Sequence, residues 1–369
     1  MPLTLSEPGK TLFQIFGGIR MKKAIVMVSL VVIAMLAMTG CGKKKEKLKL
    51  FLPGEYLGEN VIADFEKEYN CQVIIENFDS NESMYTKLQA GDKYDVLIPS
   101  DYTIERLLKE NYLQKLDKDA ITNMGNLADQ VKNLSFDPDN DYSIPYFWGT
   151  VGIIYNKKNV PLSDLEAEGF AIFKNPKYKD RVYMYDSARD GFMIALKTLG
   201  YSCNTEDDAE IEEAYNWLIE MNKTTKPVYV TDEVIDNMKA ERMDLAIVYS
   251  GDAVDIISEN PNMGYYTPAC GTNVWYDSMV IPKNAENPEL ANKFINFMLN
   301  YDQCMDGTET VGYTSPNKDV LAKVTAADGE YADNEAYLPR TYEKDEIFHD
   351  NENLRKKLGE LWIKVVATN

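Results

Sequence analysis

The sequence predicts an α/β protein made of two lobes, and three observations support this fold class. Apolar or β-branched runs that suit buried strands occur early in the chain, at 48–52, 71–76 and 94–99. Segments with helical spacing separate these runs, which is the order of βαβ units and implies a parallel sheet covered by helices. A second series of the same kind begins near residue 181, after a long apolar segment at 142–156 that suits a crossover between lobes.

In the first half of the chain, the helix signals lie between the strand runs. Apolar residues recur at helical spacing over 60–69, and Ser80 opens a helix that continues through Leu88. Residues 100–102 begin the helix that follows the third strand. The polar turn formers at 137–141 predict a turn before the crossover.

The second half repeats this order. Strands are predicted near 181–184 and at 244–249, and helices at 192–199, 211–221 and 290–299. Ser250, Gly251 and Asp252 predict a turn at the end of the second of these strands. Residues 275–282 form another apolar run.

The crossover segments set the expected lobe boundaries. We assign residues 48–150 and 277–321 to lobe 1, and residues 151–276 and 322–369 to lobe 2. Ligands of open α/β sheets bind outside the carboxyl ends of the strands. We therefore expect a ligand cleft between the lobes and a hinge in the segments that join them.

The composition is that of a globular, strongly acidic chain. Of the 369 residues 45% are hydrophobic, and 59 Asp and Glu against 39 Lys and Arg give a formal net charge of −20. Because phosphate binding needs a basic face, nucleic acid is excluded as a partner. The charge is compatible with a cationic ligand, although surface solubility is the simpler explanation. We expect a monomer.

The start of the chain has the features of a targeting segment. Lys22 and Lys23 precede an uncharged stretch at 24–37, and small residues then lead to Cys41. The stretch is too short for a confident membrane span. Its end, at 38–41, resembles a bacterial lipobox, in which the cysteine is lipidated and becomes the mature N-terminus.

We therefore interpret residues 1–40 as a leader with a signal peptide, with Met21 as the true start. Lipidation of Cys41 would anchor the protein to the cell membrane on its extracytoplasmic side, with residues 41–47 as a tether. A plain secretory signal and an uncleaved anchor are the alternatives.

The remaining cysteines do not predict a metal site. Cys71, Cys203, Cys270 and Cys304 are widely spaced and form no CxxC pair. They allow up to two disulfides in three pairings, or buried thiols, which we favour slightly. Because the chain has a single histidine, His349, we expect no metal and no cofactor.

Aromatic residues beside carboxylates follow the predicted strands. These positions are Glu55, Tyr56, Ser100, Asp101, Tyr102, Asp186, Asp190, Tyr249, Asp252, Trp275, Tyr276, Asp277 and Tyr313. A carboxylate neutralises an ammonium group through charge-assisted hydrogen bonds. Aromatic faces hold the ammonium and its methylene chain by cation–π contact and apolar burial. Together they suit a flexible organic cation, although such neighbours also arise by chance in an acidic, tyrosine-rich chain.

Several longer segments resemble one known family. The most specific is DPDNDYSIPYFWGTVGI at 137–153, and the others lie at 80–88, 94–102, 209–218, 275–282 and 311–317. These segments are similar to segments that follow one another in the same order in the spermidine/putrescine-binding lipoproteins of ABC transporters, the PotD-type family. The resemblance implies a type II periplasmic-binding-protein fold, whose two lobes close on a ligand around a hinge.

The resemblance also implies ligand-binding residues. Matching positions of the family are occupied here by Tyr56, Ser100, Tyr102, Trp275, Asp277 and Tyr313. Asp190 stands where the family has a glutamate that contacts an amine, and Tyr249 replaces a tryptophan but keeps an aromatic wall. His349 falls near a glutamine of the family.

Two departures affect the expected ligand. The pair Pro53-Gly54 stands where the family usually has a tryptophan followed by Ser or Thr, and Ser187 stands where its spermidine binder has a second aspartate. One aromatic wall and one carboxylate are therefore missing. Asp101, Glu55 and Asp252 are the acidic residues that could compensate, and we keep Ser187 and Asp101 among the predicted ligand-binding residues.

The function implied by the resemblance is the solute-binding component of an ABC importer. It would capture putrescine or spermidine between two lobes and deliver it to a permease powered by a separate ATPase, without enzymatic activity. A binder of another small organic cation or amino-acid derivative is the first alternative. An extracellular hydrolase or lyase and a lipoprotein adhesin are further alternatives, although no GxSxG or HExxH motif supports the hydrolase.

Overall fold

The structure, a computed structural model, describes residues 45–368, and Lys47–Asn369 forms one compact unit. The predicted leader, the Met21 start and the lipidation site Cys41 lie outside the described residues. Among residues 45–368, no helix is both long enough and apolar enough to cross a membrane.

Within the described residues, nine strands form one mixed sheet in the order β2-β1-β3-β9-β4-β7-β5-β6, with β8 paired to β4. The strands are β1 (Lys47–Pro53), β2 (Gln72–Phe78), β3 (Val96–Leu97), β4 (Ser143–Asn156), β5 (Val182–Tyr185), β6 (Val228–Val230), β7 (Leu245–Tyr249), β8 (Met263–Tyr266) and β9 (Val274–Val280).

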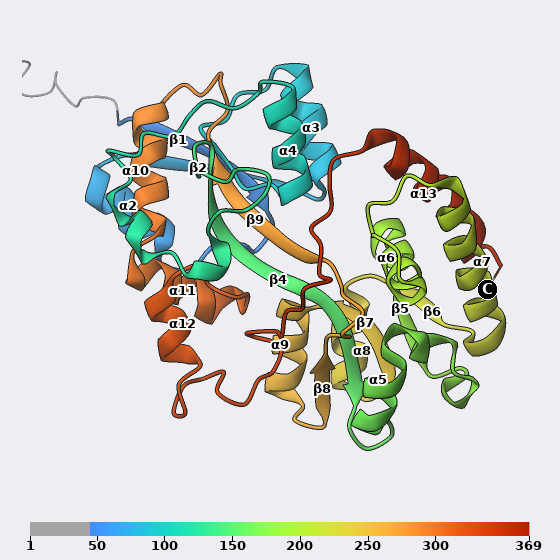
Figure 1. The fold of residues 1–369 in the computed structure, drawn as a ribbon. Coiled ribbons are helices and arrows are strands. Elements are labelled where there is room, and N and C mark those ends of the chain that lie inside the picture. The colour runs from blue at the N-terminus through green and yellow to red at the C-terminus, as the bar shows by residue number, and fades with distance from the viewer. Residues whose placement is uncertain (1–44, 369) are drawn as a thin grey trace, which may run out of the picture. The chain divides into compact units, whose positions relative to one another are not determined.

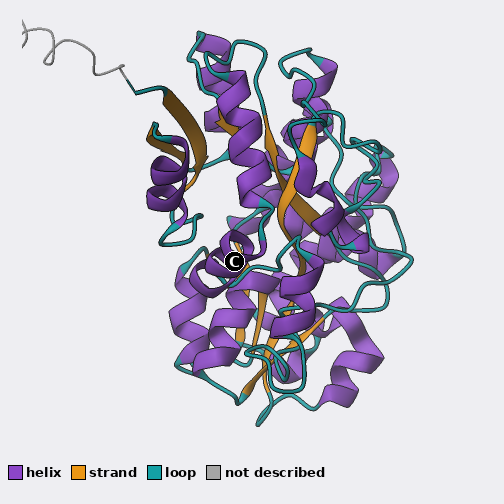
Figure 2. Cartoon of the chain, turned by 90° about the vertical axis from the view of Figure 1, so that its left-hand side faces the viewer, coloured by secondary structure: helices purple, strands orange, loops and turns teal. Residues whose placement is uncertain are grey.

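Helices cover both faces of this sheet (Figure 2). They are α2 (Val61–Tyr69), α3 (Asn81–Ala90), α4 (Asp101–Lys109), α5 (Leu162–Glu168), α6 (Ala188–Leu199), α7 (Asp208–Thr225), α8 (Glu233–Lys239), α9 (Ser250–Glu259), α10 (Pro288–Met298), α11 (Tyr301–Val311), α12 (Lys318–Val324) and α13 (Glu352–Val366). Short 3₁₀ helices are η1 (Thr122–Asn126), η2 (Asp129–Val131), η3 (Gly169–Lys174) and η4 (Pro176–Tyr178).

The expected parallel pairing holds only within each lobe. Strands β1, β2 and β3 pair in parallel at one end of the sheet, and β5, β6 and β7 do so at the other. In the middle, β9 and β4 pair antiparallel with each other and with their outer neighbours. These two long strands run from one lobe into the other (Figure 1).

Several predicted element boundaries were wrong. The strand expected at 94–99 is only Val96–Leu97, and the helix expected at 211–221 is Asp208–Thr225. Ser250, Gly251 and Asp252 are not a turn, because α9 begins at Ser250 directly after β7. Helix α6 begins at Ala188 rather than near residue 192, because the Ser187 side chain caps it by accepting the backbone N–H of Asp190. The expected start of α3 is confirmed, since Ser80 and Ser83 form a capping box there.

The hydrophobic core differs between the two faces of the sheet. Leu50 of β1 and Val248 of β7 belong to one cluster that continues across both lobes. Their sequence neighbours Phe51 and Ile247 point to the other face and belong to two separate clusters, one in each lobe. The cluster on one face therefore continues from lobe to lobe, whereas the other face has a separate cluster in each lobe.

The cysteines contribute to packing. Within the described part of the chain, Cys203, Cys270 and Cys304 carry free thiols, and Cys71 is buried. The preference for buried thiols is thus confirmed for Cys203 and Cys304, whereas Cys270 is partly exposed.

Candidate functional site

A cavity of about 590 Å³ lies between residues of both lobes. Ten of the eleven predicted ligand-binding residues line it, namely Tyr56, Ser100, Asp101, Tyr102, Ser187, Asp190, Tyr249, Trp275, Asp277 and Tyr313. Asp252, a predicted compensating acid, lines it as well, and so does Pro53. Most of the residues predicted from the ends of the strands therefore lie around one cavity.

Four predicted positions lie outside the lining. Two of them are Asp186, whose carboxylate accepts the Nε1–H of Trp362, and Tyr276, whose backbone N–H donates to Asp101. His349 does not line the cavity, although its neighbour Phe348 does. The His349 ring is about half exposed, and its Nδ1 lies 3.4 Å from Oε2 of Glu105 on α4. Glu55 is also outside the lining, in a turn where its φ is +52°.

A connected row of aromatic rings forms one wall. Ring centroids are separated by 5.8 Å between Tyr56 and Tyr313, 5.2 Å between Tyr313 and Trp275, and 6.3 Å between Trp275 and Tyr249. Tyr185, which follows the same strand-end rule but was not predicted, extends the row with a centroid distance of 5.3 Å to Tyr249. Most contacts are edge-to-face, which fixes the rings relative to one another.

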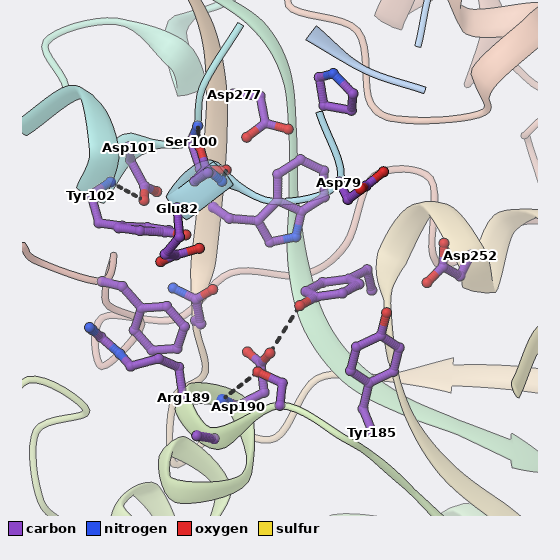
Figure 3. A pocket seen from close by; sticks show the side chains of 18 of the residues that line it. Asp79, Glu82, Ser100, Asp101, Tyr102, Tyr185, Arg189, Asp190, Asp252 and Asp277 are labelled. Carbon is purple, nitrogen blue, oxygen red and sulfur yellow. Dashed lines mark hydrogen bonds between the residues drawn. The ribbon is translucent and has the colours of Figure 1, made fainter. Parts of the chain in front are cut away.

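Each tyrosine in this row donates its hydroxyl to an aspartate. The pairs, with O–O distances, are Tyr56–Asp277 (2.5 Å), Tyr249–Asp190 (2.9 Å), Tyr185–Asp232 (3.1 Å) and Tyr313–Asp252 (3.3 Å). The aromatic wall thus carries a series of carboxylates along its length. Figure 3 shows Asp277, Asp101, Asp190 and Asp252 on different sides of the cavity.

Two glycines make room for this wall. A Cβ at Gly251 would lie only 1.5 Å from a ring carbon of Tyr313, and one at Gly149 would lie 2.7 Å from a ring carbon of Trp275. Both distances are shorter than any real contact, so the rings can occupy these positions only because the side chains are absent.

Burial raises the pKa of three of the carboxylates that pair with tyrosines, namely Asp277, Asp190 and Asp252. At Asp277 and Asp190, hydrogen bonds from neighbouring hydroxyl groups oppose the shift. Burial, with repulsion from Asp232, raises the pKa of Asp252 to about 7. A cation that entered the cavity would stabilise the ionised form of all of these groups.

Asp101 joins the two elements that carry the first-lobe part of the site. At the start of α4 it accepts the N–H of Tyr102 at 2.7 Å, and its other oxygen accepts the N–H of Tyr276 in β9 at 3.1 Å. Burial raises its pKa to about 8 despite these two hydrogen bonds. The carboxylate therefore fixes β9 between Trp275 and Asp277.

Asp190 is held less completely. Only 4% of its surface is exposed, and its Oδ1 is buried without a hydrogen-bond partner. The neighbouring Arg189 also lines the cavity, but its guanidinium lies over the ring of Phe348, with 4.2 Å from Cζ to the centroid. Arg189 was not predicted from the sequence, because a search for a site that binds cations looks for carboxylates and aromatic residues, not for another cation.

Further lining residues come from segments that the strand-end rule does not cover. They include Asp79, Asn81, Glu82, Asp232, Asn273, Phe348 and Arg355. In residues 45–368, no group of three His, Cys, Asp or Glu side chains is arranged to hold a metal ion. The polar groups of the cavity are mostly acceptors, as a ligand with several N–H donors requires.

Comparison with known proteins gives a consistent result. Residues 60–339 match the family described as bacterial extracellular solute-binding protein. A spermidine/putrescine-binding periplasmic protein of Escherichia coli is 37% identical over 265 residues, which cover 71% of this chain and 75% of that protein. A putrescine/cadaverine-binding protein of Pseudomonas aeruginosa is 30% identical over 312 residues, covering 82% and 86% of the two chains.

The fold agrees with these relatives. The solved structure of a putative spermidine/putrescine ABC transporter protein from Listeria monocytogenes superposes with a TM-score of 0.76 at 34% sequence identity, covering 88% of this chain and all of the other. The expected type II periplasmic-binding-protein fold with two α/β lobes is therefore confirmed. The chain belongs to the bacterial extracellular solute-binding proteins, and within them to the PotD-type, spermidine/putrescine-binding family.

Proposed function

We propose that this protein is the extracytoplasmic solute-binding component of an ABC importer and that it captures a polyamine between its lobes. The row of tyrosine–aspartate pairs along the aromatic wall is the observation that carries the proposal. It offers counter-charges at intervals and apolar surface between them, which matches ammonium groups separated by methylene chains.

Capture would work by bridging the lobes. Under the predicted boundaries, Asp277 belongs to lobe 1 and Asp190 to lobe 2. A diamine that contacts both carboxylates interacts with both lobes only when they are closed, so binding shifts the population toward the closed state. The unsatisfied oxygen of Asp190 supports this role, because the ligand would supply its missing donor.

Both putrescine and spermidine are proposed as ligands. Ser187 leaves one family carboxylate missing, and each ammonium group without a counter-charge in a closed cavity would cost on the order of 1–3 kcal/mol. Asp252 is buried, lines the same cavity and pairs with Tyr313, so we assign it the compensating role. Pro53 replaces a bulky aromatic residue and leaves that end of the cavity less enclosed.

Isothermal titration calorimetry on residues 42–369, refolded to remove any carried-over ligand, tests the proposal. Putrescine, cadaverine, spermidine and spermine form the panel, with choline and arginine as controls. We expect saturable one-to-one binding of at least one polyamine. A folded sample that binds none of the four, or that binds choline or arginine more tightly, would overturn the assignment.

We further propose that the closed form docks on membrane permease subunits served by a separate ATPase, as a monomer, and that Cys41 carries a lipid anchor. Family membership supports the first part, and the lipobox-like end of the leader supports the second. Mass spectrometry of the mature N-terminus tests the anchor. A Cys41→Ser protein that still carried the lipid would disprove it.

A further inference from the structure

A short segment before α13, residues 346–350, which we call the strap, is fixed to the second lobe. The Asn204 side chain donates to a strap carbonyl at 2.8 Å and accepts the backbone N–H of His349 at 2.9 Å. Arg189 of α6 lies over the ring of Phe348 and donates to the carbonyl of His349 at 3.4 Å. One side of the strap is thus held by α6 and the loop that follows it.

The other side of the strap contacts α4 of the first lobe, beside which it passes in Figure 1. Oε2 of Glu105 accepts the backbone N–H of Asp350 at 2.7 Å and lies 3.4 Å from Nδ1 of His349. Lys109, one turn further along α4, donates to the carbonyl of Asp350 at 3.3 Å. The Glu105 side chain is only 24% exposed, so solvent screens these contacts incompletely.

The strap is also part of the cavity wall. Phe348 and Arg189 line the cavity, whereas Glu105, His349 and Lys109 do not. A second polar contact lies close by, where Nη1 of Arg355 in α13 is 3.9 Å from Oε1 of Glu82 in α3, and both of these residues line the cavity. The contacts of Glu105 and Lys109 therefore link the strap to α4 from outside the cavity lining, along one edge of the cavity.

We propose that Glu105 is a positioning residue for ligand retention, acting through the strap. It holds Phe348 in the wall and links α4 to the second lobe only while the lobes are closed. Because the cavity lies between the lobes, a bound ligand leaves when they open, and a contact made only in the closed state slows that step. The inference rests on the proposed function, since it concerns release of the captured polyamine.

The kinetic signature distinguishes this role from a general structural one. Stopped-flow fluorescence, with Trp275 in the cavity as the reporter, gives association and dissociation rates for putrescine and spermidine. Glu105→Ala removes charge and acceptor, whereas Glu105→Gln removes the charge and keeps an acceptor for the Asp350 N–H. Glu289→Gln, on an exposed turn of α10, is the matched control.

We expect the dissociation rate to rise about tenfold in Glu105→Ala and about threefold in Glu105→Gln, which is the range for one charge-assisted hydrogen bond with partly exposed partners. The association rate should stay within about twofold, and the control should match wild type. Alanine favours helices, so α4 should persist. An unchanged dissociation rate in Glu105→Ala, or equal changes in both rates, would overturn the proposal.

Hydrogen exchange at the Asp350 amide gives a second reading, taken with and without polyamine. In the wild type, protection of this amide should increase when polyamine binds, and Glu105→Ala should lose that increase. Protection that stayed the same on binding in the wild type would contradict a contact confined to the closed state. If no polyamine bound at all, the proposed function would fail, while a difference in exchange between ligand-free wild type and Glu105→Ala would still show that Glu105 bonds the strap.

Discussion

The two ends of the cavity carry the same kind of group but satisfy it differently. Asp277, on β9, accepts the Tyr56 hydroxyl, and neither of its carboxylate oxygens is buried without a hydrogen-bond partner. Asp190, at the start of α6, accepts the Tyr249 hydroxyl on one oxygen and has no partner on the other. The first carboxylate is organised by its own lobe, and the second is left incomplete.

This difference indicates that the two carboxylates contribute to ligand binding in different ways. A buried carboxylate oxygen without a donor is costly in the empty protein, by roughly 1–3 kcal/mol or more. A bound ammonium group donates to that oxygen and removes the cost. The free energy of binding is therefore more favourable by about the same amount. Asp277, already hydrogen-bonded, contributes position and charge with less penalty in the empty state.

The largest effect is expected from Asp190→Asn, which tests the incomplete end. Affinity for putrescine should fall about 100-fold, which corresponds to about 3 kcal/mol. The ligand-free protein should become more stable by about 1 kcal/mol, because the unpaired buried charge is removed. Calorimetric titration and thermal unfolding measure the two quantities, and a variant that lost both affinity and stability would contradict this difference between the two carboxylates.

Asp277→Asn tests the organised end and should have a smaller effect. We expect a loss of affinity of about 30-fold without a gain in stability, because the Tyr56 hydroxyl still finds an acceptor in the amide oxygen. Asp95→Asn is the matched control. Asp95 is more deeply buried than Asp277, with 2% against 9% of its surface exposed, but it lies outside the cavity and accepts the N–H groups of Lys49 and Asn287. Its substitution should therefore lower stability and leave affinity unchanged.

The comparison also predicts that binding depends on pH. Burial raises the pKa of Asp252 to about 7 and that of Asp101 to about 8, so part of these groups is protonated at neutral pH in the empty cavity. Aliphatic amines stay charged in this range and favour the ionised carboxylates, so binding releases protons. Affinity should therefore weaken as pH falls from 8 to 6, by about tenfold in total.

Titrations at pH 7 in two buffers with different ionisation enthalpies measure the released protons directly. Asp101→Asn should reduce their number. A dissociation constant that was the same at pH 6 and pH 8, with no release of protons, would mean that these carboxylates are already ionised in the empty protein.

The sequence predicted the strand-end residues well because the fold brings the ends of different strands to one edge. Tyr56, Asp101 and Tyr249 lie at or shortly after the ends of β1, β3 and β7, and all three line the cavity. Trp275 and Asp277 line it from within β9, because this strand runs between the lobes. Tyr185 was within reach of the same rule, since it is the last residue of β5.

The remaining features depend on tertiary contacts that leave no local signal. His349 lies in a segment with no regular structure, so nothing in its neighbours shows that it contacts Glu105 rather than the cavity. The antiparallel pairing of β4 with β9 joins strands more than a hundred residues apart, and the alternating pattern of each alone is compatible with either direction. The start of α9 was missed because Ser, Gly and Asp also favour turns.

The smallest expected effect is a gain, from Ser187→Asp. Ser187 caps α6 by accepting the N–H of Asp190 at 3.4 Å, and aspartate caps a helix equally well, with its charge favoured at the helix N-terminus. The substitution adds a second carboxylate beside Asp190, at the position where the family's spermidine binder has an aspartate. A triamine has a third ammonium group to use it, whereas a diamine already paired with Asp190 and Asp277 does not. We expect affinity for spermidine to rise about fivefold and affinity for putrescine to change by less than twofold, with Ser187→Asn as the uncharged control. Equal gains for both ligands in paired titrations would show that the added charge acts through the general field of the cavity, and that Asp252 already supplies the third counter-charge.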